Sequence, residues 1–117
     1  MSGWVTVGRV DDVAPGALRG VRIGELWLAV GRHDDGTPFA IDEWCSHEEC
    51  QLSTGELEGR SVVCSCHSSA FDTTTGVPLN GPATEPIRVY EIRATGAELE
   101  VLVDVQSDDV RWTEWRL

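Results

Sequence analysis

Two short segments of this chain carry side chains that bind transition metals. The first contains Cys45 and His47, and the second, after sixteen intervening residues, contains Cys64 and His67. Each segment therefore offers one thiolate and one imidazole. Two cysteines and two histidines can hold a zinc ion, or a [2Fe-2S] cluster in which both histidines bind the same iron.

The order of these residues separates the two kinds of centre. A zinc finger usually pairs cysteine with cysteine on a hairpin and histidine with histidine on a helix, whereas here each segment carries one of each. A plant-type ferredoxin site begins with Cys-x4-Cys, which Cys45 and Cys50 match, but its next cysteine would fall at Ser53. The pattern therefore favours a cluster with two histidine ligands, and a zinc-bound structural module is the alternative.

The elements that must position these segments are β-strands. Apolar and polar residues alternate over short stretches, and turn signals such as Asp34-Asp35-Gly36 separate them. The expected strands are residues 4–8, 21–23, 26–30, 39–41, 61–63, 70–72, 88–93 and 99–103, the last two as an antiparallel pair. One strand leads to Cys45 and another to Cys64, so both metal-binding pairs are expected at strand ends. The sequence predicts a single all-β domain over residues 1–117.

Charge and hydropathy limit the partners of the protein. Nine basic and twenty acidic residues give a formal net charge of −11, which repels nucleic acid and anionic lipid and favours a partner with a basic surface. The start of the chain lacks a basic segment followed by an apolar stretch, and the longest apolar run, residues 26–30, is far shorter than the ~20 residues of a membrane span. We therefore expect a soluble, cytoplasmic protein without nucleic-acid or membrane partners.

The residues around the two metal-binding pairs resemble the Rieske iron-sulfur family. Phe71-Asp72 and Gly76 match the aromatic-acid pair and the glycine that follow the second ligand loop of the family. Gly81-Pro82-Ala83 is similar to the proline-containing loop that covers the cluster. The resemblance covers roughly residues 4–104.

This resemblance implies a fold and a ligand set. The fold is a Rieske fold of antiparallel sheets with an inserted cluster-binding subdomain, here about residues 43–81, and residues 105–117 form a C-terminal extension. One [2Fe-2S] cluster per chain is implied. Its implied ligands are Cys45 and Cys64 on one iron, and His47 and His67 on the other.

The resemblance also implies an electron carrier. No Gly-x-Gly-x-x-Gly motif follows any expected strand, so the chain lacks a usual flavin or nicotinamide domain. A non-haem iron site needs two histidines and a carboxylate, but the chain has three histidines and the cluster takes two. The chain therefore resembles the ferredoxin component of multicomponent aromatic-ring dioxygenases of the carbazole or biphenyl type. Such a monomer is not itself an enzyme and passes one electron from a flavoprotein reductase to a terminal oxygenase.

Cys50 and Cys66 favour a second interpretation. Their positions resemble those of the two disulfide cysteines in high-potential, membrane-anchored Rieske proteins, and many soluble Rieske ferredoxins lack both. The resemblance therefore implies a disulfide between them, and the alternative is two buried thiols, as the cytosol favours. The same pair would suit the small Rieske subunit of a nitrite reductase or of an arsenite-oxidase-like enzyme, which is the alternative function.

Three further residues are candidates for tuning the cluster. Ser69 matches a serine whose hydroxyl donates to cluster sulfur in high-potential relatives, although a serine here can also cap a turn. Glu48 and Glu49 follow a ligand position, where negative charge lowers the reduction potential, or they form a solvated docking surface.

Two other segments receive structural interpretations only. His33 is expected to be a turn residue without a function. The tail at residues 110–117, which holds Trp112 and Trp115, is expected to fold back over an apolar patch as a turn of helix, or to contact a partner.

Overall fold

The regular structure of the described residues is mostly β-strand. The computed structural model describes residues 2–24, 26–45, 50–66, 69–80, 83–104 and 113–115. The strands are β1 (Ser2–Arg9), β2 (Leu18–Ile23), β3 (Leu26–Arg32), β4 (Pro38–Asp42), β5 (Glu56–Glu58), β6 (Ser61–Val63), β7 (Ala70–Asp72), β8 (Pro78–Asn80), β9 (Val89–Tyr90), β10 (Ile92–Thr95), β11 (Glu98–Asp104) and β12 (Thr113–Trp115). Two short 3-10 helices are η1 (Val10–Asp12) and η2 (Leu52–Thr54). The prediction of an all-β fold is confirmed, and none of the described helices is long and apolar enough to span a membrane.

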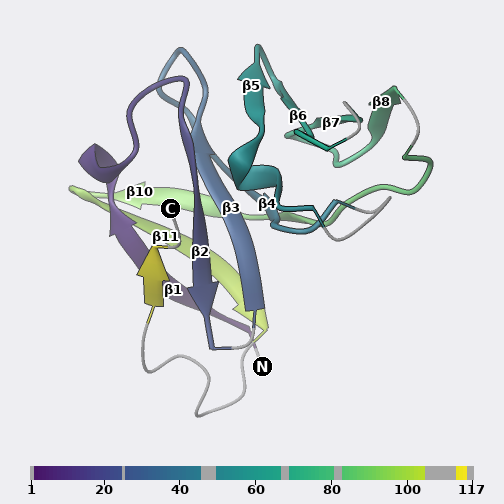
Figure 1. Cartoon of the computed structure of the whole chain (residues 1–117). Helices are drawn as coiled ribbons and strands as arrows, with labels where there is room; N and C mark the ends of the chain where they lie inside the picture. The colour runs from purple at the N-terminus through teal and green to yellow at the C-terminus, as the bar shows by residue number, and fades with distance from the viewer. Residues whose placement is uncertain are drawn as a thin grey trace.

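The strands form three antiparallel sheets (Figure 1). A five-stranded sheet has the order β12-β2-β3-β4-β9, and a three-stranded sheet has the order β1-β11-β10. A four-stranded sheet of short strands, called the small sheet below, has the order β5-β6-β7-β8. The small sheet lies to one side of the other two sheets, at the upper right of Figure 1.

Two apolar cores hold these sheets together, and β3 and β4 contribute to both. The first core joins the five-stranded and three-stranded sheets and contains Val7, Val13, Val21, Ile23, Leu28, Val30, Ala40, Tyr90, Leu99, Val101 and Val103. The second core joins the five-stranded sheet to the small sheet and contains Ala29, Phe39, Ile41, Cys45, Cys50, Leu52, Val62, Cys64, Phe71, Ala83 and Ile87. Because successive side chains of a strand point to opposite faces, a strand covered on both faces is apolar along its length. This accounts for the continuous apolar run at residues 26–30.

The expected strand at residues 88–93 is divided between two sheets. Val89 and Tyr90 pair with β4, whereas β10 pairs with β11. The predicted antiparallel pairing with residues 99–103 is therefore confirmed only from Ile92 onward. The Tyr90 hydroxyl donates to Asp42 Oδ1 at 2.8 Å, which secures the first part to the end of β4. Burial of this hydroxyl and its bond to Asp42 raise the pKa of Tyr90 above its usual range.

The C-terminal tail adds a strand to the five-stranded sheet. Residues 113–115 form β12, which pairs antiparallel with β2, with Thr113 opposite Ile23 and Trp115 opposite Val21. The expectation that the tail folds back on the protein is confirmed for these residues. The expected turn of helix is wrong for them, because the free edge of β2 supplies backbone partners that favour an extended segment.

Candidate metal centre

Cys45 lies at the base of a loop that follows β4. Its backbone N–H donates to the carbonyl oxygen of Cys50 at 2.9 Å, and Trp44 and Gln51 form an isolated β-bridge beside this bond. The Cys45 side chain is only 5% exposed, although it belongs to a loop. The sequence folds this way because β4 delivers the chain into the second core, where Cys45 packs among apolar residues.

Cys64 lies at the base of a second loop, which joins β6 to β7. Its backbone N–H donates to the carbonyl oxygen of Ser69 at 2.7 Å. Each of the two loops is thus closed by a bond from the cysteine N–H to the carbonyl five residues later. Cys64 is buried and belongs to the same core cluster as Cys45. The structure therefore brings the two predicted cysteine ligands into one core, as expected for loops that share a metal.

A disulfide joins the two loops. It links Cys50 to Cys66, whose Cα atoms are 6.4 Å apart, and these are the two cysteines that the resemblance had paired. The sulfur of Cys64 lies within 4.8 Å of both bridged sulfurs. Ser65 of the second loop adds another contact, because its hydroxyl oxygen lies 3.1 Å from Oγ1 of Thr54, which follows the first loop in the chain. The bridge ties the loops together next to a candidate ligand.

Removing the disulfide is expected to lower the free energy of unfolding by about 3 kcal/mol, since a bridge spanning 16 residues restricts the unfolded chain by roughly that amount. The variant is Cys50→Ser with Cys66→Ser, and urea titration followed by tryptophan fluorescence measures the loss. A dithiol reductant should shift the unmodified protein toward the variant and leave the variant unchanged. Equal midpoints for both proteins without reductant would contradict the prediction.

Glu43, which was not identified from the sequence, joins the end of β4 to η2, the short helix that follows the first loop. Its side chain is completely buried, and its two carboxylate oxygens accept hydrogen bonds from the backbone N–H and the hydroxyl of Ser53 at 2.9 and 2.6 Å. Its own carbonyl accepts from Leu52 N at 2.6 Å. Burial raises the pKa of Glu43, and the bonds from Ser53 and Gln51 oppose that rise. Glutamate is seldom buried, so only its place between a strand and Cys45 could have signalled this role.

Ser69 ties the second loop to the segment that follows β8. Its side chain is fully buried, and its hydroxyl oxygen accepts a hydrogen bond from Ala83 N at 3.1 Å. This contact brings Ala83, the last residue of the predicted proline-containing loop, against the base of the second loop. Ser69 therefore holds two chain segments together, in addition to any contact with a cluster.

The other predicted site residues lie outside the described residues. These are His47, His67, Glu48 and Glu49. The donor set that is described fits an iron-sulfur centre, because thiolates are the usual ligands of such clusters. Cys45 and Cys64 are buried thiols, while the disulfide removes Cys50 and Cys66 from the possible thiolate ligands.

Comparisons with known proteins give a consistent result. The family described as the Rieske [2Fe-2S] domain matches residues 3–91. Ferredoxin CarAc of Metapseudomonas resinovorans is 36% identical over 99 residues, which are 84% of this chain and 92% of that protein. The biphenyl dioxygenase ferredoxin subunit of Pseudomonas sp. (strain KKS102) is 40% identical over 96 residues, covering 81% and 85% of the two chains.

Solved structures also resemble most of this chain. A chain in the complex of reduced oxygenase and oxidized ferredoxin in carbazole 1,9a-dioxygenase has a TM-score of 0.78 and 35% identity, covering 84% of this chain and 91% of its own. A structure described as a nitrite reductase small subunit from Mycobacterium tuberculosis has a TM-score of 0.80 over 91% of this chain and 99% of its own. Its identity is 24%, so it shows similarity of fold alone.

Proposed function

Since this chain belongs to the Rieske [2Fe-2S] domain family, we propose that it is the ferredoxin of an aromatic-ring dioxygenase system. It is an electron carrier rather than an enzyme, as are the ferredoxin components it resembles. We propose that it accepts one electron from a flavoprotein reductase and delivers it to a terminal oxygenase in the cytoplasm. A carrier that must release two partners in turn is expected to be a monomer.

We assign the ligands of the cluster to Cys45 and Cys64 on one iron and to His47 and His67 on the other, in a cluster-binding subdomain of about residues 43–81. When bound, a [2Fe-2S] cluster with two histidine ligands supplies a one-electron centre with a potential above that of plant-type ferredoxins. The observation that carries this assignment is the burial of two unbridged thiols in one core, at the bases of two loops closed in the same way. The disulfide supports it by fixing one loop on the other.

The chain's own residues would determine how the centre meets its partners. The disulfide and the Glu43 contacts hold the loop bases, so little rearrangement is needed when an electron arrives or leaves. The acidic surface of the protein favours encounter with basic docking surfaces, and this attraction is screened by salt.

Reconstituted electron transfer tests the proposal. The purified protein should be coloured, should contain two irons and two sulfides per chain, and should elute as a monomer. It should be reduced by NADH through a flavoprotein ferredoxin reductase and reoxidised by a terminal oxygenase with its aromatic substrate. Both rates should fall as the ionic strength rises, because charge-guided encounters are screened.

Two outcomes would overturn the proposal. A colourless protein with stoichiometric zinc would identify a structural metal module instead. A chain that co-purifies with a catalytic subunit, and that does not exchange electrons as a free protein, would identify a fixed subunit of a larger enzyme.

A further inference from the structure

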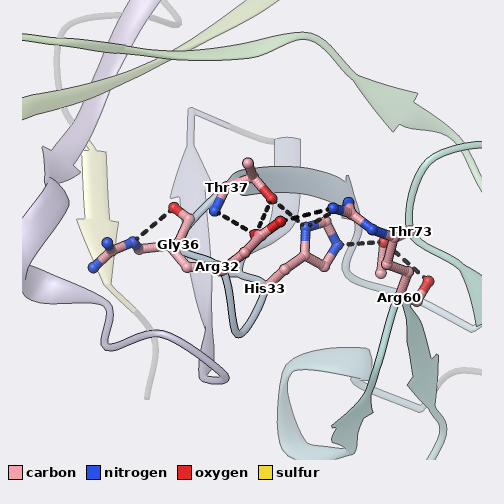
Figure 2. Close-up of polar contacts among 7 residues, drawn as sticks. Arg32, His33, Gly36, Thr37, Arg60 and Thr73 are labelled. Carbon is pink, nitrogen blue, oxygen red and sulfur yellow. Dashed lines mark hydrogen bonds and ion pairs between the residues drawn. The ribbon is translucent and has the colours of Figure 1, made fainter.

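A network of polar contacts joins the turn between β3 and β4 to the small sheet (Figure 2). His33 stands at its centre and is only 5% exposed, with its ring stacked on Phe39 at a centroid distance of 4.8 Å. Its Nε2 atom lies 2.7 Å from Thr73 Oγ1, and its Nδ1 atom lies 3.1 Å from Arg60 Nη1. A residue expected to be a functionless turn residue thus contacts the small sheet through both ring nitrogens.

The hydrogen bonds around Thr73 determine which ring nitrogen carries a proton. The Thr73 hydroxyl donates to the carbonyl oxygen of Arg60 at 3.0 Å, and this uses its single proton. Toward His33 the Thr73 oxygen can therefore act only as an acceptor. It follows that Nε2 of His33 is protonated and donates to Thr73.

The contact with Arg60 determines the state of the other nitrogen. A guanidinium group has five N–H donors and no acceptor, so Arg60 Nη1 can only donate to Nδ1. Nδ1 must then present a lone pair. Together, the contacts define a neutral imidazole with its proton on Nε2.

Thr37 provides a second partner for Nδ1, and this partner can accept a hydrogen bond only when Nδ1 is protonated. The Thr37 hydroxyl lies 2.9 Å from Nδ1, and it donates its own proton to Asp35 Oδ1 at 2.6 Å. Its oxygen is therefore an acceptor placed beside Nδ1. If Nδ1 takes up a proton, it can donate to Thr37, but it can no longer accept from Arg60, whose positive charge then faces a second cation.

We propose that His33 is a positioning residue that holds the small sheet against the β3–β4 turn while its imidazole is neutral, and that protonation of Nδ1 exchanges Arg60 for Thr37 and releases this contact. The contact matters because of what the small sheet carries. Arg60 lies between β5 and β6, and Thr73 follows β7, so these residues flank the strands on either side of the loop that begins at Cys64. A shift of the small sheet would therefore move the loop that carries Cys64. Only this last step, in which Cys64 is a cluster ligand, rests on the proposed function.

The charges facing His33 come from three elements. Arg60 in the β5–β6 turn opposes protonation, while Asp35 in its own turn and Asp72 on β7 favour it. Arg60 also pairs with Asp35 at 2.9 Å, which keeps its guanidinium beside the ring. Burial, followed by Arg60, lowers the pKa of His33 below its ordinary value of 6.5. A cavity of ≈ 220 Å³, lined by His33, Arg60 and Tyr90 among others, adjoins the network.

The sign of the pH effect follows from this lowered pKa. Below pH 6.5 the unfolded chain binds the proton more readily than the folded protein does. The contribution of His33 to stability is therefore complete above that pH, and it is lost as the pH falls toward the pKa of the folded protein.

Nitrogen-detected NMR of the oxidised holoprotein, labelled at histidine, tests the proposal directly. At neutral pH, His33 should show a protonated Nε2 and an unprotonated Nδ1. Arg60→Gln removes the opposing charge and should raise the titration midpoint of His33 by about 1 pH unit. Thr37→Val removes the hydroxyl acceptor for the protonated form, while the backbone of residue 37 is kept, and should lower the midpoint. If His33 only packed against its neighbours, its titration midpoint would not move in opposite directions in these two variants, both of which alter exposed residues.

Backbone hydrogen exchange tests the release of the small sheet. The N–H of Thr73 donates to the carbonyl oxygen of Arg60 at 2.9 Å, so its protection reports the turn between β5 and β6. After correction for intrinsic exchange, protection should fall at least threefold below the His33 midpoint in the unmodified protein. In His33→Gln, which does not titrate, protection should not vary with pH.

Three results would overturn the proposal: a protonated Nδ1 at neutral pH, an unchanged midpoint in Arg60→Gln, or protection of Thr73 that is independent of pH in the unmodified protein. None of these readouts measures the cluster itself, and each can be repeated on protein that holds no iron. A protein that shows the titration but holds no iron would therefore overturn the proposed function and leave the inference about His33 intact.

Discussion

Cys64→Ser is expected to abolish cluster binding and, with it, electron transfer. A serine hydroxyl is a far weaker ligand for iron-sulfur centres than a thiolate, and Cys66, the other cysteine of this loop, is held in the disulfide. Visible absorbance, iron content and the rate of reoxidation by the oxygenase should all fall to background, a loss of at least 100-fold in the rate. The same result is expected for Cys45→Ser.

The bridged cysteines provide the matched control for this experiment. Cys50→Ser with Cys66→Ser alters two positions in the same loops, one of them two residues from Cys64, but it removes no proposed ligand. This variant should be less stable and should still be coloured when purified in the cold. If it bleaches while Cys64→Ser keeps its iron, the ligand assignment is wrong.

Glu43→Ala is expected to lower the free energy of unfolding by about 4 kcal/mol. The substitution leaves the buried N–H and hydroxyl of Ser53 without acceptors, at about 1–3 kcal/mol for each group, and it opens a cavity under the first loop. The base of the loop at Cys45 should then lose its fixed position, so cluster content at 25 °C should also decrease. Urea titration and iron analysis measure the two effects.

Glu43→Gln distinguishes the hydrogen bonds from the volume of the side chain. Its amide oxygen can still accept from Ser53 N, and its size is nearly unchanged, so a loss of only about 1–2 kcal/mol is expected from the remaining unpaired hydroxyl. If the alanine and glutamine variants were equally stable, the bonds to Ser53 would not be what stabilises the loop.

The parts of the fold that local sequence determines were predicted well. β3, β4, β6 and β7 have strong alternating or continuous apolar patterns, and the expected ranges match them closely. β5 and β8 were missed, because Leu57 and Leu79 are their only large apolar side chains and their pairing depends on the neighbouring strand in the small sheet. The division between β9 and β10 was also missed, because the sheet with which a strand pairs is determined by distant segments and not by the strand's own residues.

The residues of the candidate site were likewise predicted only where local sequence signals them. Cys45 and Cys64 were identified because their residue types and spacing are unusual. Glu43 was missed because its partner Ser53 lies ten residues away. His33 sits among polar turn residues, and its burial arises only when segments 27 and 40 positions later fold over it. Long-range polar contacts of this kind leave no periodic pattern in a sequence.

The last strand has a consequence for the behaviour of the protein in concentrated solution. β12 occupies backbone donors and acceptors along residues 21–23 of β2, and it lies outside the residues that match the family. An uncovered edge strand can pair with the same strand of a second molecule and start aggregation. The tail thus makes the edge of the sheet self-capped at residues 21–23, so this part of β2 does not offer its backbone to a second molecule.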